Sequence, residues 1–329
     1  MRSSFESVSK LKRQSVEIAQ LIKSFDFNDD LYSKEKIHRM YDCGNVATFY
    51  CQKTDKGLIP KKLKFSNFCK QRFCPLCASL RSRHHSFYLG QACEQLLAKG
   101  YKFSFMTLTV PNVPLSRLSE TLTFMLQSLT ARFVKREKFK KAYDGYFRNF
   151  EVTFKFENGE IWCHPHLHVL CAIPPECYKS GVSYYPQADL VNDWRECIKA
   201  DPMADCICDI RAVDGRNIKK SVQEVIKYCF DFDSIIDLLR NMNADQFLLL
   251  DQSLKNRKYF SINGSLQYNN FHFVQFDELD SKYLSSDYVI CKYRYDTNCK
   301  RYIFVEVFKS PLPYVPNTDR CFYFDKMIC

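Results

Sequence analysis

The chain has 329 residues, of which 46% are apolar and 15% aromatic, with only 9 glycines. This composition is ample for a packed core and argues against a disordered or fibrous protein, while the length allows one large domain or two. The 48 lysines and arginines outnumber the 37 acidic residues, and the formal net charge of +11 suits a polyanionic partner such as nucleic acid.

The sequence has no run of about 18 apolar residues, the length that a membrane-spanning helix needs. Its first residues, MRSSFESVSKLKRQ, lack the apolar core of a signal peptide. We therefore expect a cytoplasmic protein without a membrane segment. The 17 cysteines are an odd number and come without an export signal, which indicates reduced thiols or metal ligands rather than disulfides.

Residues 1–99 are predicted to form a helical segment around a cysteine-rich block. Residues 4–25 have apolar side chains at helical spacing, and a second short helix is expected before residue 42. The cysteine-rich block runs from Cys43 to Cys77. A further helix is predicted from Ala78 to Lys99, and Gly100 suits its C-cap.

Residues 100–235 alternate between strand and helix patterns, which predicts an α+β sheet with helices packed on it. The Asn158-Gly159 pair predicts a tight hairpin between the second and third strands. The predicted strands are Tyr101–Val110, Gly145–Phe156, His164–Ile173 and Cys206–Val213, and the predicted helices are Ser116–Lys141, Pro186–Lys199 and Ile218–Phe230.

Residues 236–329 are a third expected segment, packed on this core. It begins with a leucine-rich helical piece and continues through residues 253–267, which are typical of a loop with a short turn. An aromatic, strand-like stretch follows. No chemistry is predicted for this segment.

Three of the 7 histidines lie in one predicted strand, as His164-Pro165-His166-Leu167-His168. Because side chains alternate along a strand, the histidines share one face, and His166 and His168 stand side by side. Two neighbouring imidazoles suit a divalent metal ion. The alternative is a structural or surface role, since histidine is often only a hydrogen-bonded polar residue.

The predicted helix over residues 218–230 carries a carboxylate and a phenol one turn apart, Glu224 and Tyr228. Both fall outside the helix's apolar stripe. An ordinary solvent-exposed pair would have the same spacing. A phenol beside a metal that polarises a phosphate is a recognisable nucleophile, however, and the histidine strand favours that interpretation.

The cysteine-rich block has the spacing of a zinc knuckle, Cys69-x4-Cys74-x2-Cys77. Cys43 is the first choice for a fourth ligand, with Cys51 and His84 as reserves. Core thiols without a metal are the alternative. A structural zinc here would fold a small module and turn four basic side chains towards DNA, namely Lys70, Arg72, Arg81 and Arg83.

In five segments the chain resembles plasmid rolling-circle replication initiators. These proteins belong to the wider group of HUH single-strand DNA endonucleases, in which two histidines flank one hydrophobic residue. The resemblance covers about residues 35–266, with a weaker match in SLKNRKYFSINGSL at 253–266. The five segments, in the family's order, are CKQRFCPLCASLRSR at 69–83, FMTLTVPNV at 105–113, GYFRNFEVTF at 145–154, HPHLHVL at 164–170 and SVQEVIKYCF at 221–230.

The resemblance implies a fold and two metal sites. The fold is an HUH-type antiparallel β-sheet with helices packed on it, together with an N-terminal helical and zinc-binding cysteine module. His166 and His168 match the pair that holds Mg²⁺ or Mn²⁺. Glu151 is our candidate for a third ligand, because the predicted hairpin brings its strand against the histidines. The family's cysteines also favour Cys43 as the fourth zinc ligand.

The resemblance also implies the chemistry. Tyr228 matches the nucleophile that attacks the origin phosphodiester and leaves a 5′-phosphotyrosine and a free 3′-hydroxyl. Glu224 matches the carboxylate that activates water for the terminating cut. Many relatives carry a lysine three residues after the tyrosine, where this chain has Asp231, so we expect Lys227 or Lys220 to contact the phosphate instead.

The implied partner is DNA, as origin duplex or hairpin and as a single strand, and a host helicase and polymerase are expected as well. The nearest rival is a transposase or relaxase built on the same site. A rival from another class is a zinc-containing DNA-binding regulator without catalysis.

Overall fold

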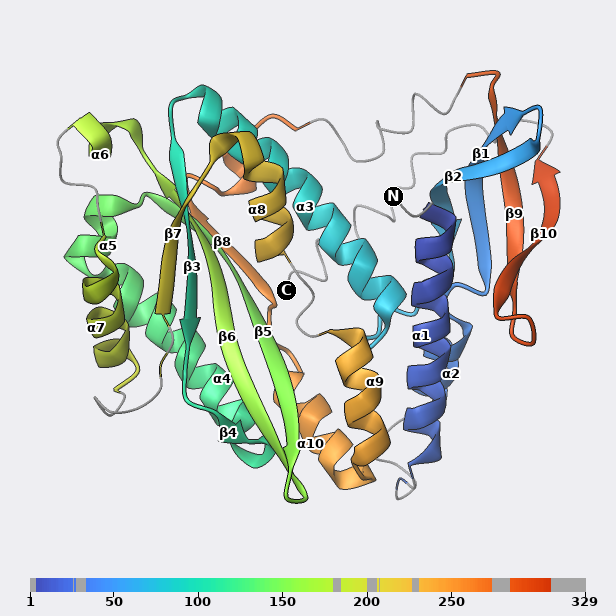
Figure 1. Ribbon diagram of the computed structural model, residues 1–329, viewed down its shortest axis with the longest axis horizontal. Helices are drawn as coiled ribbons and strands as arrows, with labels where there is room; N and C mark the ends of the chain where they lie inside the picture. The colour runs from blue at the N-terminus through green and yellow to red at the C-terminus, as the bar shows by residue number, and fades with distance from the viewer. Residues whose placement is uncertain are drawn as a thin grey trace. The chain divides into compact units, whose positions relative to one another are not determined.

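The structure is a computed structural model that describes residues 4–25, 27, 34–179, 185–199, 206, 208–226, 231–273 and 285–308 (Figure 1). Backbone contacts divide the chain into two compact units. The first unit contains the described parts of residues 1–81 and 274–329, and the second contains the described parts of residues 82–273. None of the helices in these described ranges is long and apolar enough to cross a membrane.

The first unit contains a four-stranded antiparallel sheet in the order β10-β9-β1-β2. Aromatic rings from α1, β1 and β9 pack in its core, where the centroids of Phe5, Phe49 and Tyr293 lie 5.3–5.5 Å apart. Its elements are α1 (Ser4–Ser24), α2 (Lys34–Asp42), β1 (Val46–Thr54), β2 (Gly57–Ser66), β9 (Tyr288–Asp296) and β10 (Arg301–Phe308).

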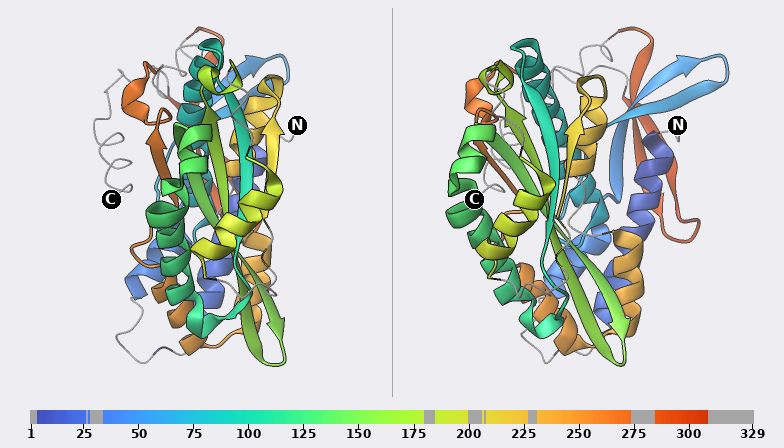
Figure 2. Two further views of the ribbon diagram at one scale, coloured as in Figure 1. Left: turned by 90° about the vertical axis from the view of Figure 1, so that its left-hand side faces the viewer. Right: turned by 60° about the vertical axis from the view of Figure 1, so that its left-hand side comes forward.

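The second unit is built on an antiparallel sheet in the order β7-β3-β6-β5-β8, with the short β4 paired to β6. The β5–β6 hairpin runs well past the end of β3 (Figure 2). The strands are β3 (Lys102–Thr109), β4 (Val113–Pro114), β5 (Gly145–Glu157), β6 (Glu160–Ile173), β7 (Cys208–Val213) and β8 (Phe260–Gly264).

Helices cover both faces of this second sheet (Figure 1). On one face, α3 and α8 bury an apolar cluster that includes Leu89, Val222, Phe105 and Leu170. On the other face lie α4, α5 and α7, and the Trp194 indole of α7 donates a hydrogen bond to the Thr109 carbonyl. The helices are α3 (Pro75–Ala98), α4 (Leu118–Gln127), α5 (Glu137–Ala142), α6 (Pro175–Lys179), α7 (Gln187–Cys197), α8 (Ile218–Val225), α9 (Phe232–Asn241) and α10 (Ala244–Leu254).

Much of the predicted element order is confirmed, and the chain is an α+β protein with antiparallel sheets. The helices expected over residues 4–25 and 78–99 are present as α1 and α3, and the hairpin of β5 and β6 turns at Asn158-Gly159. Both turn residues have positive φ, 53° and 80°, as a two-residue hairpin of the Asn-Gly type requires.

The long helix predicted over Ser116–Lys141 was wrong, because the chain breaks near its middle. α4 ends at Gln127, a π-helical turn and a 3-10 turn follow, and Arg136 is extended, with φ −65° and ψ 141°, before α5 begins. The Arg136 guanidinium lies 2.7 Å from the carboxylates of Asp193 and Glu196 on α7. This tertiary contact outweighs the helical propensity of the segment.

The loop predicted over residues 253–267 was also wrong in part, because it contains β8. Gly264 pairs with Gly145 of β5. A side chain at Gly264 would collide with the backbone of Asp144, and one at Gly145 would collide with Ser265. Two glycines therefore allow the strands to approach, and this pairing of distant residues leaves no local sequence pattern.

The compact units differ from the three segments expected at 1–99, 100–235 and 236–329. The cysteine-rich block contains the β1–β2 hairpin, which the sequence pattern did not predict. β9 pairs with β1 from Val46 to Gln52, so strands from the end of the chain complete a sheet that begins near its start. Such non-local pairing sets unit boundaries that composition does not indicate.

Candidate active site and metal centres

The histidine strand is β6, in the middle of the second sheet. On one face of β6, Leu170 lies in the core under α3 and α8, and His168, His166 and His164 continue the same row. Pro165 pairs with Val152 of β5 on one side. On its other side it lies in a gap, because the pairing with β3 ends at His166 and the pairing with β4 begins at Cys163. A residue without an N–H donor is therefore tolerated in this central strand.

Glu151 faces the two histidines from β5, where it pairs with His166 in the register. Its Oε2 atom lies 3.0 Å from Nε2 of His166 and 2.9 Å from Nε2 of His168. The three side chains are only 11–16% exposed. Burial raises the pKa of Glu151, but the hydrogen bonds from the two histidines outweigh it and lower that pKa to about 2.

The ligand atoms of Glu151, His166 and His168 all lie within 4.8 Å of one another. Adjacent ligands about 2.1 Å from an octahedral ion lie about 3.0 Å apart, which is the spacing seen between the carboxylate and each imidazole. Two imidazole nitrogens and one carboxylate oxygen are also a suitable donor set for Mn²⁺ or Mg²⁺. The three residues therefore fit a divalent cation.

A hydrogen bond at the far side of one of the two rings agrees with this fit, while Nδ1 of His168 is buried and has no hydrogen-bond partner among the described residues. Nδ1 of His166 lies 3.3 Å from the His164 carbonyl oxygen, to which it can donate. In the structure, Nε2 of His166 donates to the Glu151 carboxylate. In the tautomer with the proton on Nδ1, the lone pair of Nε2 would instead be available to a metal cation. His164 itself bonds through Nδ1 to the Asn112 side chain and stands outside the three-residue group.

The described part of the helix predicted over residues 218–230 is α8, Ile218–Val225, and its buried stripe is confirmed at Ile218, Val222 and Val225. Glu224 lies off that stripe, and its Oε1 atom is 2.6 Å from Nη2 of Arg211 on β7. Tyr228 and Lys227 lie outside the described residues, so their predicted roles stay predictions.

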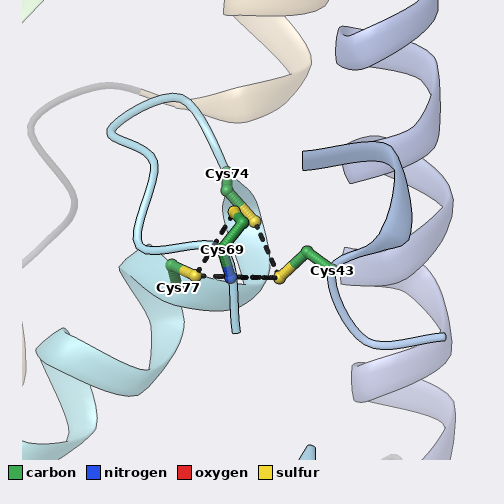
Figure 3. A group of neighbouring side chains, drawn as sticks. All are labelled: Cys43, Cys69, Cys74 and Cys77. Carbon is green, nitrogen blue, oxygen red and sulfur yellow. Dashed lines mark hydrogen bonds between the residues drawn. The ribbon is translucent and has the colours of Figure 1, made fainter. Parts of the chain in front are cut away.

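The four predicted cysteine ligands are brought together in the first unit (Figure 3). The Sγ atom of Cys43 lies 3.5 Å from that of Cys74 and 3.7 Å from that of Cys77, and the sulfurs of Cys69 and Cys77 are 3.7 Å apart. A disulfide would need about 2.05 Å, whereas four sulfurs about 2.3 Å from one zinc lie about 3.8 Å apart.

Backbone N–H groups surround these sulfurs. Those of Cys69 and Lys70 donate to Sγ of Cys43 and of Cys77, at 3.4 and 3.2 Å. Such donors stabilise thiolates, the form in which cysteine binds a metal. The reserve candidates Cys51 and His84 lie elsewhere, in β1 and α3, and are not part of the group.

The basic residues predicted to contact DNA differ in how exposed their side chains are. Arg83 and Lys220 are exposed, and the other described members are half-buried. Lys70 has a positive φ of 62° because its loop folds back so that its N–H reaches the Cys77 sulfur. The half-buried members are Lys70, Arg72 and Arg81.

Two residues at the histidine face were not singled out from the sequence, Phe105 and Arg211. Phe105 packs its ring 5.6 Å from the His168 ring, and the Arg211 guanidinium lies 4.7 Å from the centre of the Phe105 ring. Strand alternation predicts which face of its own strand each residue occupies. The strand order β7-β3-β6, which brings both residues close to His168, cannot be predicted from a local sequence pattern.

A family model described as replication protein matches residues 60–301, most of the chain. The chain therefore belongs to the family of plasmid Rep replication initiators that its sequence resembles, and that prediction is confirmed.

Several curated relatives are replication proteins named "Protein rep". "Protein rep" of Streptococcus pneumoniae serotype 2 is 32% identical over 66% of this chain and 65% of its own length, so the chain spans about two thirds of that relative. "Protein rep" of a Bacillus species is 29% identical over 72% of this chain and 80% of the relative, and that of Bacillus amyloliquefaciens is 29% identical over 72% of each. No solved structure gives a significant match.

Proposed function

We propose that the protein is a rolling-circle replication initiator of the HUH type, which nicks and rejoins one DNA strand at an origin. The observation that carries this proposal is the convergence of Glu151, His166 and His168 on one sheet face in a chain of the replication protein family. These residues would hold Mg²⁺ or Mn²⁺, and an ion there would polarise the scissile phosphate.

The chain's own residues supply the rest of the proposed chemistry. Tyr228, just beyond the described end of α8, attacks the phosphorus atom and leaves a 3′-hydroxyl that primes synthesis. The covalent bond preserves the energy of the phosphodiester, so the strand can be rejoined without ATP. Glu224 then directs water at the regenerated origin and ends the cycle.

The four-cysteine group is proposed to hold a structural zinc. Cys43 directly follows α2, whereas Cys74 directly precedes α3 and Cys77 lies in its first turn. The group therefore ties together two parts of the chain that are far apart in sequence, since Cys43 lies 26 residues before Cys69. A zinc here would fold the first unit around a tetrahedral centre and present nearby basic side chains to origin duplex. Host helicase and polymerase are proposed partners at the exposed primer end.

The proposal is tested with a labelled single-stranded oligonucleotide that contains the origin sequence. With Mn²⁺, the wild-type protein should cleave it and form a covalent protein–DNA adduct, and Tyr228→Phe should form no adduct. A chain that binds duplex DNA but cleaves no origin-derived strand would instead be a DNA-binding regulator. Cleavage directed to transposon ends or transfer origins would assign a transposase or relaxase.

A further inference from the structure

Arg211 stands at the edge of the histidine face, and one aromatic ring separates it from the candidate metal centre. β7 pairs with β3 so that Arg211 lies opposite Phe105. The guanidinium carbon is 4.7 Å from the centre of the Phe105 ring, and that ring is 5.6 Å from the His168 ring. The stacked contact holds the planar cation in one orientation beside the site.

A carboxylate engages the other side of this cation. Nη2 of Arg211 lies 2.6 Å from Oε1 of Glu224, and their side chains are 50% and 31% exposed. An ion pair with this exposure adds little to stability, because water screens it and two long side chains lose freedom. Because half of the Arg211 side chain is exposed, its guanidinium is still accessible to an anion that arrives from solvent.

The ion pair conflicts with the role proposed for Glu224. A carboxylate oxygen that accepts a short hydrogen bond from a guanidinium is occupied by that contact and is not aimed at a water molecule. Oε1 of Glu224 becomes available to water once Arg211 has moved to another anion. The single strand on the histidine face offers one, since each nucleotide that flanks the scissile phosphate brings a phosphate of its own.

We propose that Arg211 binds a backbone phosphate of the single strand on the histidine face, and that its transfer to that phosphate releases Oε1 of Glu224 from this ion pair, so that the oxygen can direct water. This inference rests on the proposed function. In the terminating step, the water oxygen bonds to phosphorus while the bond from phosphorus to the 3′ oxygen breaks. Glu224 takes the proton of the water, and the leaving 3′ oxygen takes a proton from solvent.

The inference predicts opposite effects for the two partners of the ion pair. Arg211→Gln should weaken binding of a fluorescent single-stranded oligonucleotide at least about tenfold, because a charged hydrogen bond to phosphate is lost. It should also lower the slope of log affinity against log salt by about 0.7, the value for one phosphate contact on a single strand. Glu224→Gln should tighten binding, because the anion that competes for Arg211 is gone.

A matched control comes from another ion pair on α8. Lys219 lies 3.1 Å from Glu94 of α3, with side chains 79% and 48% exposed. Lys219→Gln and Glu94→Gln change the net charge by the same amounts as the two test variants, and neither should alter affinity more than about twofold. Arg211→Lys keeps the charge and should keep the salt slope, which separates loss of a contact from misfolding.

Affinities are measured without added divalent metal, so that the strand stays intact, and folding is checked by circular dichroism. The inference would be overturned if Arg211→Gln left the affinity and the salt slope unchanged. It would also be overturned if Glu224→Gln raised the affinity no more than Glu94→Gln does. Adduct formation by the wild type with Mn²⁺ is the separate readout. A wild type that forms the adduct while Arg211→Gln binds normally refutes only the Arg211 assignment, and a wild type without an adduct refutes the proposed function itself.

Discussion

At the scale of single residues, the candidate centre depends on one carboxylate oxygen. Oε2 of Glu151 accepts hydrogen bonds from two imidazoles at 2.9–3.0 Å, and the strand register holds all three groups in place. Because the backbone ladder fixes the positions, substituting one ligand should remove its chemistry without unfolding the sheet. Such substitutions therefore separate the proposed metal function of these residues from any part in stability.

His168→Ala should therefore lower Mn²⁺-dependent nicking of a labelled oligonucleotide by at least about 100-fold, because a metal ligand contributes several kcal/mol to phosphate polarisation. Duplex binding, measured by gel shift, should change little, since it depends on phosphate contacts elsewhere. His164→Ala is the matched control, because it lies on the same face but outside the three-residue group. Loss of duplex binding in His168→Ala would mean that the residue is structural.

Glu224→Ala is predicted to separate nicking from termination. The variant should still cleave and rejoin strands, because the proposed function assigns those steps to Tyr228 and the metal. It should accumulate covalent protein–DNA complexes, since no base remains to direct water. Denaturing gels of reactions followed over time measure both products. Normal release of the protein would contradict the role given to Glu224.

At the scale of elements, local sequence patterns were sufficient to predict those helices and turns that depend only on residues close together in the sequence. The 4–25 and 78–99 helices, the Asn158-Gly159 hairpin and the shared histidine face all follow from periodicity and turn chemistry. Glu151 could be placed against the histidines for the same reason. Its role as a metal ligand stays a prediction.

Features that depend on distant partners could not be predicted in this way. β8 is a strand because two glycines let it approach β5, and the helix after Ser116 breaks where Arg136 bonds to α7. The Arg211–Glu224 pair likewise requires the position of α8 beside β7. Tertiary context decides each of these, and no window of sequence contains it.

The cysteine group yields a prediction at this scale. Cys74→Ser should reduce the zinc content from about one ion per chain to near zero and lower the melting temperature, because metal binding and folding of this element are coupled. Cys51→Ala is the control, since it replaces a buried thiol of the same unit outside the group. Atomic absorption and thermal melts measure the two effects. A fully folded, active Cys74→Ser protein would remove the zinc assignment.

At the scale of the whole molecule, the chain forms two compact units with separate candidate metal centres. The cysteine group lies in the first unit, and the Glu151 group lies in the second. Metal loss from one centre should therefore leave the other unit folded. The net charge of +11 is a property of the whole chain and would favour DNA of any sequence, so we expect recognition of the proposed origin to depend on particular residues rather than on net charge.

A strong zinc chelator is expected to shift only part of the thermal unfolding. In scanning calorimetry, the transition that belongs to the first unit should move to lower temperature. The transition of the second unit should stay in place, because its apolar cluster takes residues of α3 only from Leu89 onward and contains none of the four cysteines. Cys77 lies in the first turn of α3, which belongs to the first unit. Cys74→Ser should reproduce the shift without the chelator. One cooperative transition that moves as a whole would show that the units do not unfold separately.

The most direct test of the account is to identify the residue that becomes joined to DNA. The wild-type protein is incubated with Mn²⁺ and an origin-derived single strand, digested, and analysed by mass spectrometry. We predict one adduct, a 5′-phosphate on Tyr228, that is absent from His168→Ala. An adduct on another residue, or an equal yield of the Tyr228 adduct in His168→Ala, would contradict it.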